Sequence, residues 1–76
     1  MTEKEICQYS KVRIAHIREN LEYTIKEEPA EVGDIGFVVE IYKTKNHPDG
    51  YEVECVLQNG TTKWLATFYK NEITPA

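Results

Sequence analysis

Two histidines and two cysteines are the residues of this sequence that could take part in nucleophilic chemistry. Cys55 with His16 or His47 would form a thiol–imidazole pair, but such a pair works only at about 3 Å, with a third group that orients the histidine. Cys55 alternates with Val53 and Leu57 along an expected strand, which places its thiol in the core. We therefore expect a buried, inert thiol and no catalytic residue.

The same four side chains, Cys7, His16, His47 and Cys55, could in principle bind zinc. None of them is spaced like a Cys-x₂-Cys or His-x₃-His half-site, so we expect neither a metal nor another cofactor. A Cys7–Cys55 disulfide is the less favoured alternative, because secreted domains of this size that depend on disulfides usually carry four or more cysteines. Two reduced thiols are expected.

Paired carboxylates are the other candidate for chemistry. Glu52 and Glu54 share one face of an expected strand, about 7 Å apart by strand geometry. Acid–base catalysis also needs a cleft that raises the pKa of one carboxyl group, and 76 residues leave little room for a cleft. The glycines of Gly33–Gly36 lack the lysine and the following helix of a phosphate-binding loop. The sequence therefore predicts a protein that is not an enzyme.

Three turn signals divide residues 35–69 into three strands. They lie at Val32–Gly36, at Asn46–Gly50 and at Gln58–Thr61. The last contains Asn-Gly, the strongest short hairpin signal, and in the second the proline starts the turn while Gly50 is free to adopt a positive φ. Each break falls between segments rich in strand-forming residues.

Alternation with a period of two predicts which strand faces are buried. The charge at Glu40 marks its face of the first strand as solvent-exposed, opposite the face that carries Phe37. In the third strand Trp64 and Phe68 share one face and Tyr69 lies on the other. Because both faces of that strand are apolar, we expect both to be partly covered, or one to be a binding surface.

The N-terminal third allows two interpretations. Val12 and Ile14 read as inward positions of a short strand, with a second strand near residues 21–25, whereas Ile14, Ile17, Leu21 and Ile25 also lie on one face of a helix. The alternatives for residues 11–27 are strand–loop–strand, which is favoured, and helix. Residues 1–9 are expected to be an extension that frays or forms one helical turn, preceding a domain at 10–76.

Size and charge limit the class of protein. The chain is long enough for one small core, and it has no apolar run that could span a bilayer and no signal peptide, so a cytoplasmic protein is expected. The net charge is −4, and residues 1–40 hold nine acids and five bases against four of each in residues 41–76. Because phosphate repels such a surface, nucleic acid is an unlikely partner and a basic protein is favoured.

The strand pattern resembles known small barrels. Val32–Tyr42, followed by Gly50–Cys55, is similar to the Gly-Asp-x-Gly-x-Val-Val-Glu core of small bacterial SH3-like barrel domains of unknown function, with Cys55 in place of an aromatic residue. The same core is similar to the KOW motif of ribosomal and transcription-elongation proteins. Ser10–Ile14 and Phe68–Ile73 look like the first and last segments of the photosystem I PsaE-type barrel.

This resemblance implies a mostly β fold, a small SH3-like barrel of four to five antiparallel strands, and it tips residues 11–17 towards strand. It implies no common chemistry, because these domains share a fold and not a reaction. They typically act by surface contact, as accessory subunits, adaptors or components of conflict systems.

The expected function is therefore a protein-binding module that docks on a more basic partner through its long first loop, at about residues 18–34, and the adjacent strand faces. Such a module would be an accessory subunit, or a protein of the immunity, antitoxin or inhibitor kind. Exposed aromatic residues are common at interfaces. The sequence has eight aromatic residues, and we expect two or three of them to be exposed together. The candidate partner-binding residues are Tyr23, Glu27, Glu28, Glu31, Asp34, Trp64 and Tyr69. The alternative is a KOW-like nucleic-acid or ribosome-associated domain, whose basic stripe would need Lys43, Lys45, Lys63 and Lys70.

Overall fold

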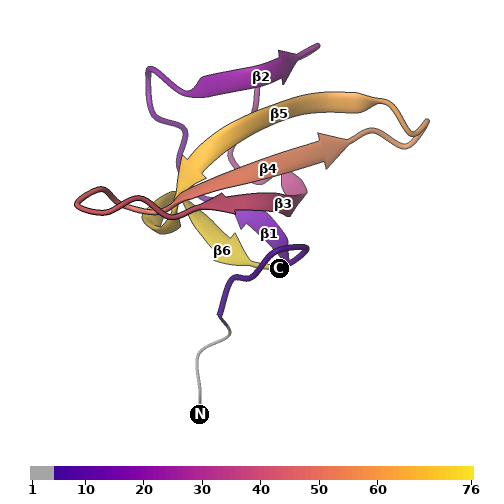
Figure 1. The fold of residues 1–76 in the computed structure, drawn as a ribbon. Coiled ribbons are helices and arrows are strands. Elements are labelled where there is room, and N and C mark those ends of the chain that lie inside the picture. The colour runs from indigo at the N-terminus through magenta and orange to yellow at the C-terminus, as the bar shows by residue number, and fades with distance from the viewer. Residues whose placement is uncertain (1–4) are drawn as a thin grey trace.

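A computed structural model describes residues 5–76, which form one antiparallel sheet and a single 3-10 turn (Figure 1). The elements are β1 (Lys11–Ile14), β2 (Glu22–Lys26), β3 (Ile35–Tyr42), β4 (Gly50–Val56), β5 (Thr62–Tyr69), η1 (Lys70–Glu72) and β6 (Ile73–Pro75). The strand order is β2-β5-β4-β3-β1-β6. The prediction of a mostly β domain is confirmed. The predicted number of four to five strands was wrong, because the terminal segment forms a sixth strand. The end strands β2 and β6 do not pair with each other, so the sheet is not closed.

Residues 11–27 form a strand, a loop and a strand, so the favoured interpretation is confirmed over the helix. β1 lies between β3 and β6, with Val12 opposite both Gly36 and Pro75. The side chains of Val12 and Ile14 are fully buried. Pairing on both edges, together with this burial, outweighs the helical spacing of the apolar residues, because tertiary contacts decide such local ambiguity.

The core lies on one face of the curled sheet. Its largest fully buried side chains are Trp64, Phe68, Ile14, Val12, Val38 and Val53. The Trp64 and Phe68 rings lie 5.5 Å apart and are tilted by 59°, within the range of favourable aromatic pairs. The face predicted for Trp64 and Phe68 on β5 is therefore the buried one. Figure 1 shows the long β3–β4–β5 meander between β2 and the β1–β6 pair.

A β-bulge corrects the prediction for β3. The pairing of β3 with β4 shifts between Val38 and Glu40, so a simple alternation does not hold across that point. Val38 is fully buried, whereas Phe37 is 47% exposed. The sequence pattern had assigned the face of Phe37 to the core, because the charge at Glu40 was taken to mark its own face along the whole strand.

One glycine is required by close packing. A Cβ atom at Gly36 would lie 2.6 Å from Cγ1 of Val53 and 2.8 Å from the carbonyl oxygen of Glu54, so only glycine allows β3 to approach β4 this closely. The expected positive φ at Gly50 was wrong. Gly50 begins β4, and the positive φ in that loop, 68°, belongs to Asn46.

Both cysteines are free; Cys55 is buried, as predicted, and Cys7 is exposed. Residues 5–9 contain a turn but no helical turn, and the rest of the predicted N-terminal extension lies outside the described residues. Within residues 5–76, no helix is long and apolar enough to cross a membrane.

Candidate functional site

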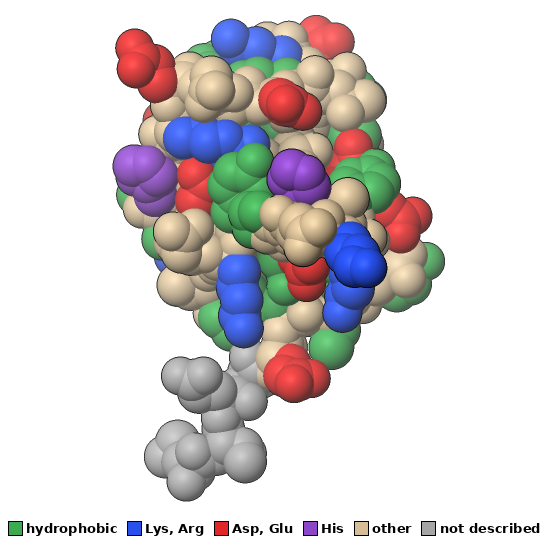
Figure 2. All heavy atoms as spheres, turned by 60° about the vertical axis from the view of Figure 1, so that its left-hand side comes forward, with side chains coloured by type: hydrophobic (Ala, Val, Ile, Leu, Met, Phe, Trp, Pro, Cys, Tyr) green, Lys and Arg blue, Asp and Glu red, His purple; other side chains and the backbone are tan. Residues whose placement is uncertain are grey.

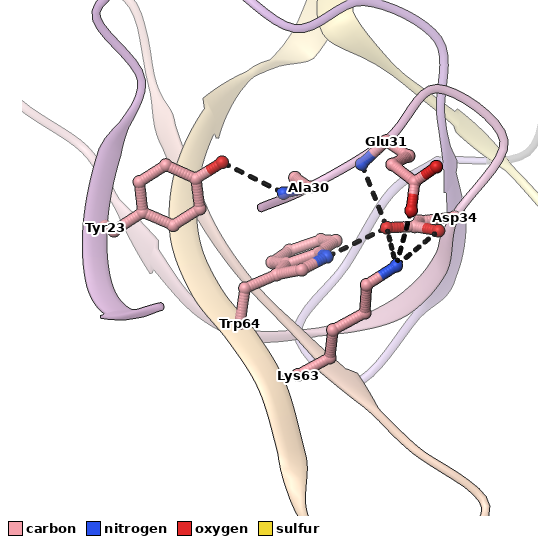
Figure 3. A network of polar contacts seen from close by, with 6 residues as sticks. All are labelled: Tyr23, Ala30, Glu31, Asp34, Lys63 and Trp64. Atoms are coloured by element: carbon pink, nitrogen blue, oxygen red, sulfur yellow. Dashed lines mark hydrogen bonds and ion pairs between the residues drawn. The ribbon is translucent and has the colours of Figure 1, made fainter. Parts of the chain in front are cut away.

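The loop that precedes β3 is anchored by the carboxylate of Asp34 (Figure 3). The indole N–H of Trp64 donates to its Oδ2 over 2.9 Å, and the backbone N–H of Glu31 donates to the same oxygen over 3.0 Å. The ammonium group of Lys63 lies 3.2 Å from Oδ2 and 3.3 Å from Oδ1. One carboxylate therefore joins the loop to two neighbouring residues of β5.

These contacts change the acidity of Asp34. Partial burial acts to raise the pKa of this carboxyl group, but the hydrogen bonds from Trp64, the Glu31 amide and Lys63 more than offset it, so the pKa lies below its ordinary value. The carboxylate is ionised at neutral pH as a result. The Asp34 carboxylate already accepts hydrogen bonds from three residues of its own chain.

Lys63 is enclosed by the same cluster. Its ammonium group lies 3.1 Å from Oε1 of Glu31 as well as against Asp34, and its side chain is buried. Hydrogen bonds to Glu31 and then to Asp34 raise the pKa of Lys63. Lys63 thus carries a charge that two carboxylates neutralise, and it cannot contribute to the basic stripe that the nucleic-acid alternative would require.

The other half of the loop is held by hydrogen bonds that its backbone N–H groups donate. The N–H groups of Glu27 and Glu28 both donate to the carbonyl oxygen of Lys63, at 3.0 and 3.1 Å. The hydroxyl of Tyr23 accepts a 2.9 Å hydrogen bond from the N–H of Ala30, which is also drawn in Figure 3. The acidic loop is therefore held in one conformation from Glu27 to Asp34, as a preorganised binding surface must be.

Beside this loop lies a hollow of about 550 Å³, the acid-rimmed hollow. Its lining residues come from the end of β2, the start of the acidic loop and the β4–β5 hairpin: Ile25, Glu27, Glu28, Leu57, Thr61 and Thr62. Ile25 is 38% exposed. Neither carboxylate on the rim forms an ion pair with another residue in the described part of the chain. The site combines apolar surface with two carboxylates that have no cationic partner there.

The predicted partner-binding residues fall into three groups. Glu27 and Glu28 are exposed at the acid-rimmed hollow, and Glu31 is exposed but paired with Lys63. Tyr23 and Asp34 hold the loop in place. Trp64 contacts Asp34 from the core, and Tyr69 lies apart from the loop at the far end of β5.

Trp64, a candidate partner-binding residue in the sequence, offers no surface to a partner. Its side chain is fully buried, because it fills the core while its indole nitrogen reaches Asp34. Tyr69 is 39% exposed but lies at the other end of β5, with the guanidinium of Arg18 4.5 Å above its ring. The two aromatic residues therefore share no exposed patch.

Sequence reasoning missed Ile25 and Leu57, which line the acid-rimmed hollow. Both were interpreted as alternating core positions, and neither is fully buried. A usable signal was present: Ile25 directly precedes a run of charged residues, and Leu57 directly precedes the Asn-Gly turn. Apolar residues at strand ends often lie beside loops, where partner contacts concentrate.

The residues first considered for chemistry occupy ordinary structural positions. Burial raises the pKa of the Cys55 thiol, which disfavours the reactive thiolate. Glu52 accepts hydrogen bonds from the hydroxyls of Tyr42 and Thr24, and Glu54 accepts one from Thr62. Within residues 5–76, no three histidine, cysteine or acidic side chains lie close enough together to hold a metal ion.

Comparisons with protein families, with characterised proteins and with solved structures found no match for this chain. The fold and the site described above therefore carry the functional argument.

Proposed function

We propose that this protein is a small SH3-like barrel that acts as a protein-binding module and docks on a more basic partner. The order of elements supports the barrel: a first strand, a long connection that contains the strand β2, a three-stranded meander, a 3-10 turn and a short last strand that pairs with the first. That order matches the layout of the families that the sequence resembles. A binding function suits a chain whose described residues present shallow hollows rather than a deep cavity.

The acid-rimmed hollow is the observation that carries this proposal. Glu27 and Glu28 supply negative charge that no cation among residues 5–76 neutralises, beside the apolar side chains of Ile25 and Leu57. Apolar contact supplies affinity at an interface, while charge of one sign accelerates encounter with an oppositely charged surface. A partner segment with apolar and basic side chains would satisfy both features.

The nucleic-acid alternative has less support. Lys63, one of its four required lysines, is neutralised by Glu31 and Asp34. The acidic loop at the same end of the molecule would repel a phosphate backbone.

Capture from the native lysate tests the proposal, with three matched baits. The first is the unaltered protein and the second carries Glu27→Lys and Glu28→Lys. The third carries Glu19→Lys and Glu40→Lys, which changes the net charge equally at exposed positions away from the hollow. Glu31 is left unchanged because it pairs with Lys63.

We expect one basic protein that the first and third baits retain and the second loses. A partner that all three baits retain would place the interface elsewhere. A partner that is itself acidic, or a nucleic acid, would contradict the proposed class.

A further inference from the structure

The outward face of β1, β3 and β4 carries an aromatic residue between two charges of opposite sign. Lys11 on β1 is the cross-strand partner of Phe37 on β3, and Phe37 is the partner of Glu54 on β4. Residues directly paired across antiparallel strands point to the same face of the sheet. Their sequence neighbours Val12 and Val53 are fully buried, so this row points away from the core. We refer to the surface around the row as the Phe37 face.

The Phe37 face has apolar surface at its centre. The side chain of Phe37 is 47% exposed. Val56, two residues after Glu54 on β4, is 46% exposed, and the alternation of the strand places it on the same face as Glu54. Diagonal neighbours of an antiparallel pair lie about 7 Å apart, so the Val56 side chain lies near the ring of Phe37. Contact with a partner would remove this apolar surface from water, which is favourable.

The charges of the Phe37 face are separated by sign. Lys11 and Arg13 are the exposed residues of β1, whereas the carboxylate on the other side of Phe37 belongs to Glu54. None of these three charged residues forms an ion pair with another residue among 5–76. β1 and β4 are two strand spacings apart, about 10 Å, and the ring of Phe37 lies between their charges. On the side of the molecule drawn in Figure 2, by contrast, basic and acidic side chains are interspersed around a hydrophobic patch.

A two-fold rotation makes the Phe37 face complementary to itself. If the axis runs along β3 at Phe37, β1 of one copy lies over β4 of the other. Lys11 of each copy then faces Glu54 of the other copy, and the two Phe37 rings meet at the axis. A two-fold interface joins the same patch of both subunits in this way. Its centre is apolar and its rim is charged, which is the usual arrangement of protein interfaces.

We propose that the Phe37 face binds a second copy of this chain, so that the protein forms a weak two-fold dimer. The order of base, aromatic residue and acid across three strands is the order that a two-fold axis requires, because the rotation brings each base over an acid. The contact between two curled sheets is small, so the dimer dissociates on dilution. None of these residues lines the acid-rimmed hollow, so the proposal does not rest on the proposed function.

Sedimentation equilibrium of the purified full chain, over an about hundredfold range of concentration, tests the proposal. We expect the mean mass to rise from that of one chain towards that of two. Lys11→Glu and Glu54→Lys each replace both ion pairs of the dimer by repulsions, and each should weaken association at least about tenfold. The melting temperature of each variant in dilute solution should barely change, because neither residue is part of an ion pair within residues 5–76.

An exchange of charges separates this contact from a general effect of net charge. An equimolar mixture of the Lys11→Glu and Glu54→Lys proteins should associate as tightly as the unaltered protein, because the acidic face of one variant meets the basic face of the other. The chain that carries both substitutions keeps the net charge of −4 and should again dimerise with itself. Glu27→Lys/Glu28→Lys is the control and should dimerise like the unaltered protein, whatever its effect on the partner of the proposed function.

Two results would overturn the proposal. A chain that stays monomeric at every concentration would leave the Phe37 face to a different protein. Association that both single variants retain, or that the mixture does not restore, would place the contact between copies elsewhere on the molecule.

Discussion

At each end of β5, a carboxylate forms an ion pair with a cation that lies beside an aromatic residue. At the start of the strand, Asp34 binds Lys63 and the indole of Trp64. At its far end, Glu72 binds Arg18, whose guanidinium covers the ring of Tyr69. The difference lies in the position of the ring. Trp64 is buried in the core, whereas Tyr69 remains part of the surface.

The comparison shows that similar ion pairs hold both ends of β5, while the residues around each pair determine the chemistry of the exposed surface. Near Asp34 the cation is shared by two carboxylates, and the acids Glu27 and Glu28 form no ion pair within the described part of the chain. Near Glu72 the surface that remains is aromatic, with lysines and carboxylates in balance. One small sheet thus presents two surfaces of different chemistry.

We expect the largest loss of stability from substitution of Glu72. Glu72 is buried and accepts hydrogen bonds from Arg18 and from the backbone N–H of Tyr69. Glu72→Ala should lower the free energy of unfolding by about 3 kcal/mol, because it leaves a partly buried cation without its partner. Urea unfolding measures this. Glu72→Gln, which keeps an acceptor, should lose about half as much, and equal losses for the two variants would show that the charge is irrelevant.

The corresponding change at the other end should be smaller. Asp34→Ala leaves the Trp64 N–H without its acceptor, but Lys63 keeps Glu31 as a partner. We expect a loss of about 2 kcal/mol in the free energy of unfolding, typical of an unsatisfied buried donor. Glu31→Gln is the control and should cost less than about 0.5 kcal/mol, because the Glu31 side chain is 70% exposed. A larger loss for Glu31→Gln than for Asp34→Ala would contradict the central position of Asp34.

The pH dependence of stability sharpens the comparison further. The pKa of Asp34 is lower in the folded protein than its ordinary value of 3.8. The stability that its charge contributes is therefore fully present above about pH 5, about one unit above the unfolded-state pKa, and is lost as the pH falls through the lower, folded-state pKa. Thermal melts of the protein and of Asp34→Asn between pH 2 and 7 should differ by a constant amount above pH 5 and converge below pH 4. A difference that stays constant down to pH 2 would show that the charge is not involved.

Local signals in the sequence predicted the strands well. The turns at 46–50 and 58–61 separate β3, β4 and β5 close to where they were expected, because turn residues and alternation act over only a few positions. The glycine-marked break at Val32–Gly36 was also visible. The bulge after Val38 was not, because it depends on how β3 pairs with β4.

The candidate site was predicted only in part, because its contacts join residues about 30 positions apart. The acids at Glu27 and Glu28 were found from charge alone. Trp64 donates a hydrogen bond to Asp34 across 30 residues, and nothing near Trp64 in the sequence signals that contact. Likewise, Ile25 and Leu57 form one hollow only because β2 pairs with β5 beside the β4–β5 hairpin.

The most direct measurement of the central claim is the association rate of the captured partner with Glu27→Lys/Glu28→Lys, over a range of salt concentrations. If the acid-rimmed hollow steers a basic partner, the variant should associate several-fold more slowly than the unaltered protein at low ionic strength. The difference should shrink near 0.5 M salt, where the Debye length is about 4 Å. Its melting temperature should barely change, because exposed charges contribute little to stability. An unchanged association rate at low salt, or a rate equal to that of the Glu19→Lys/Glu40→Lys control, would contradict the account.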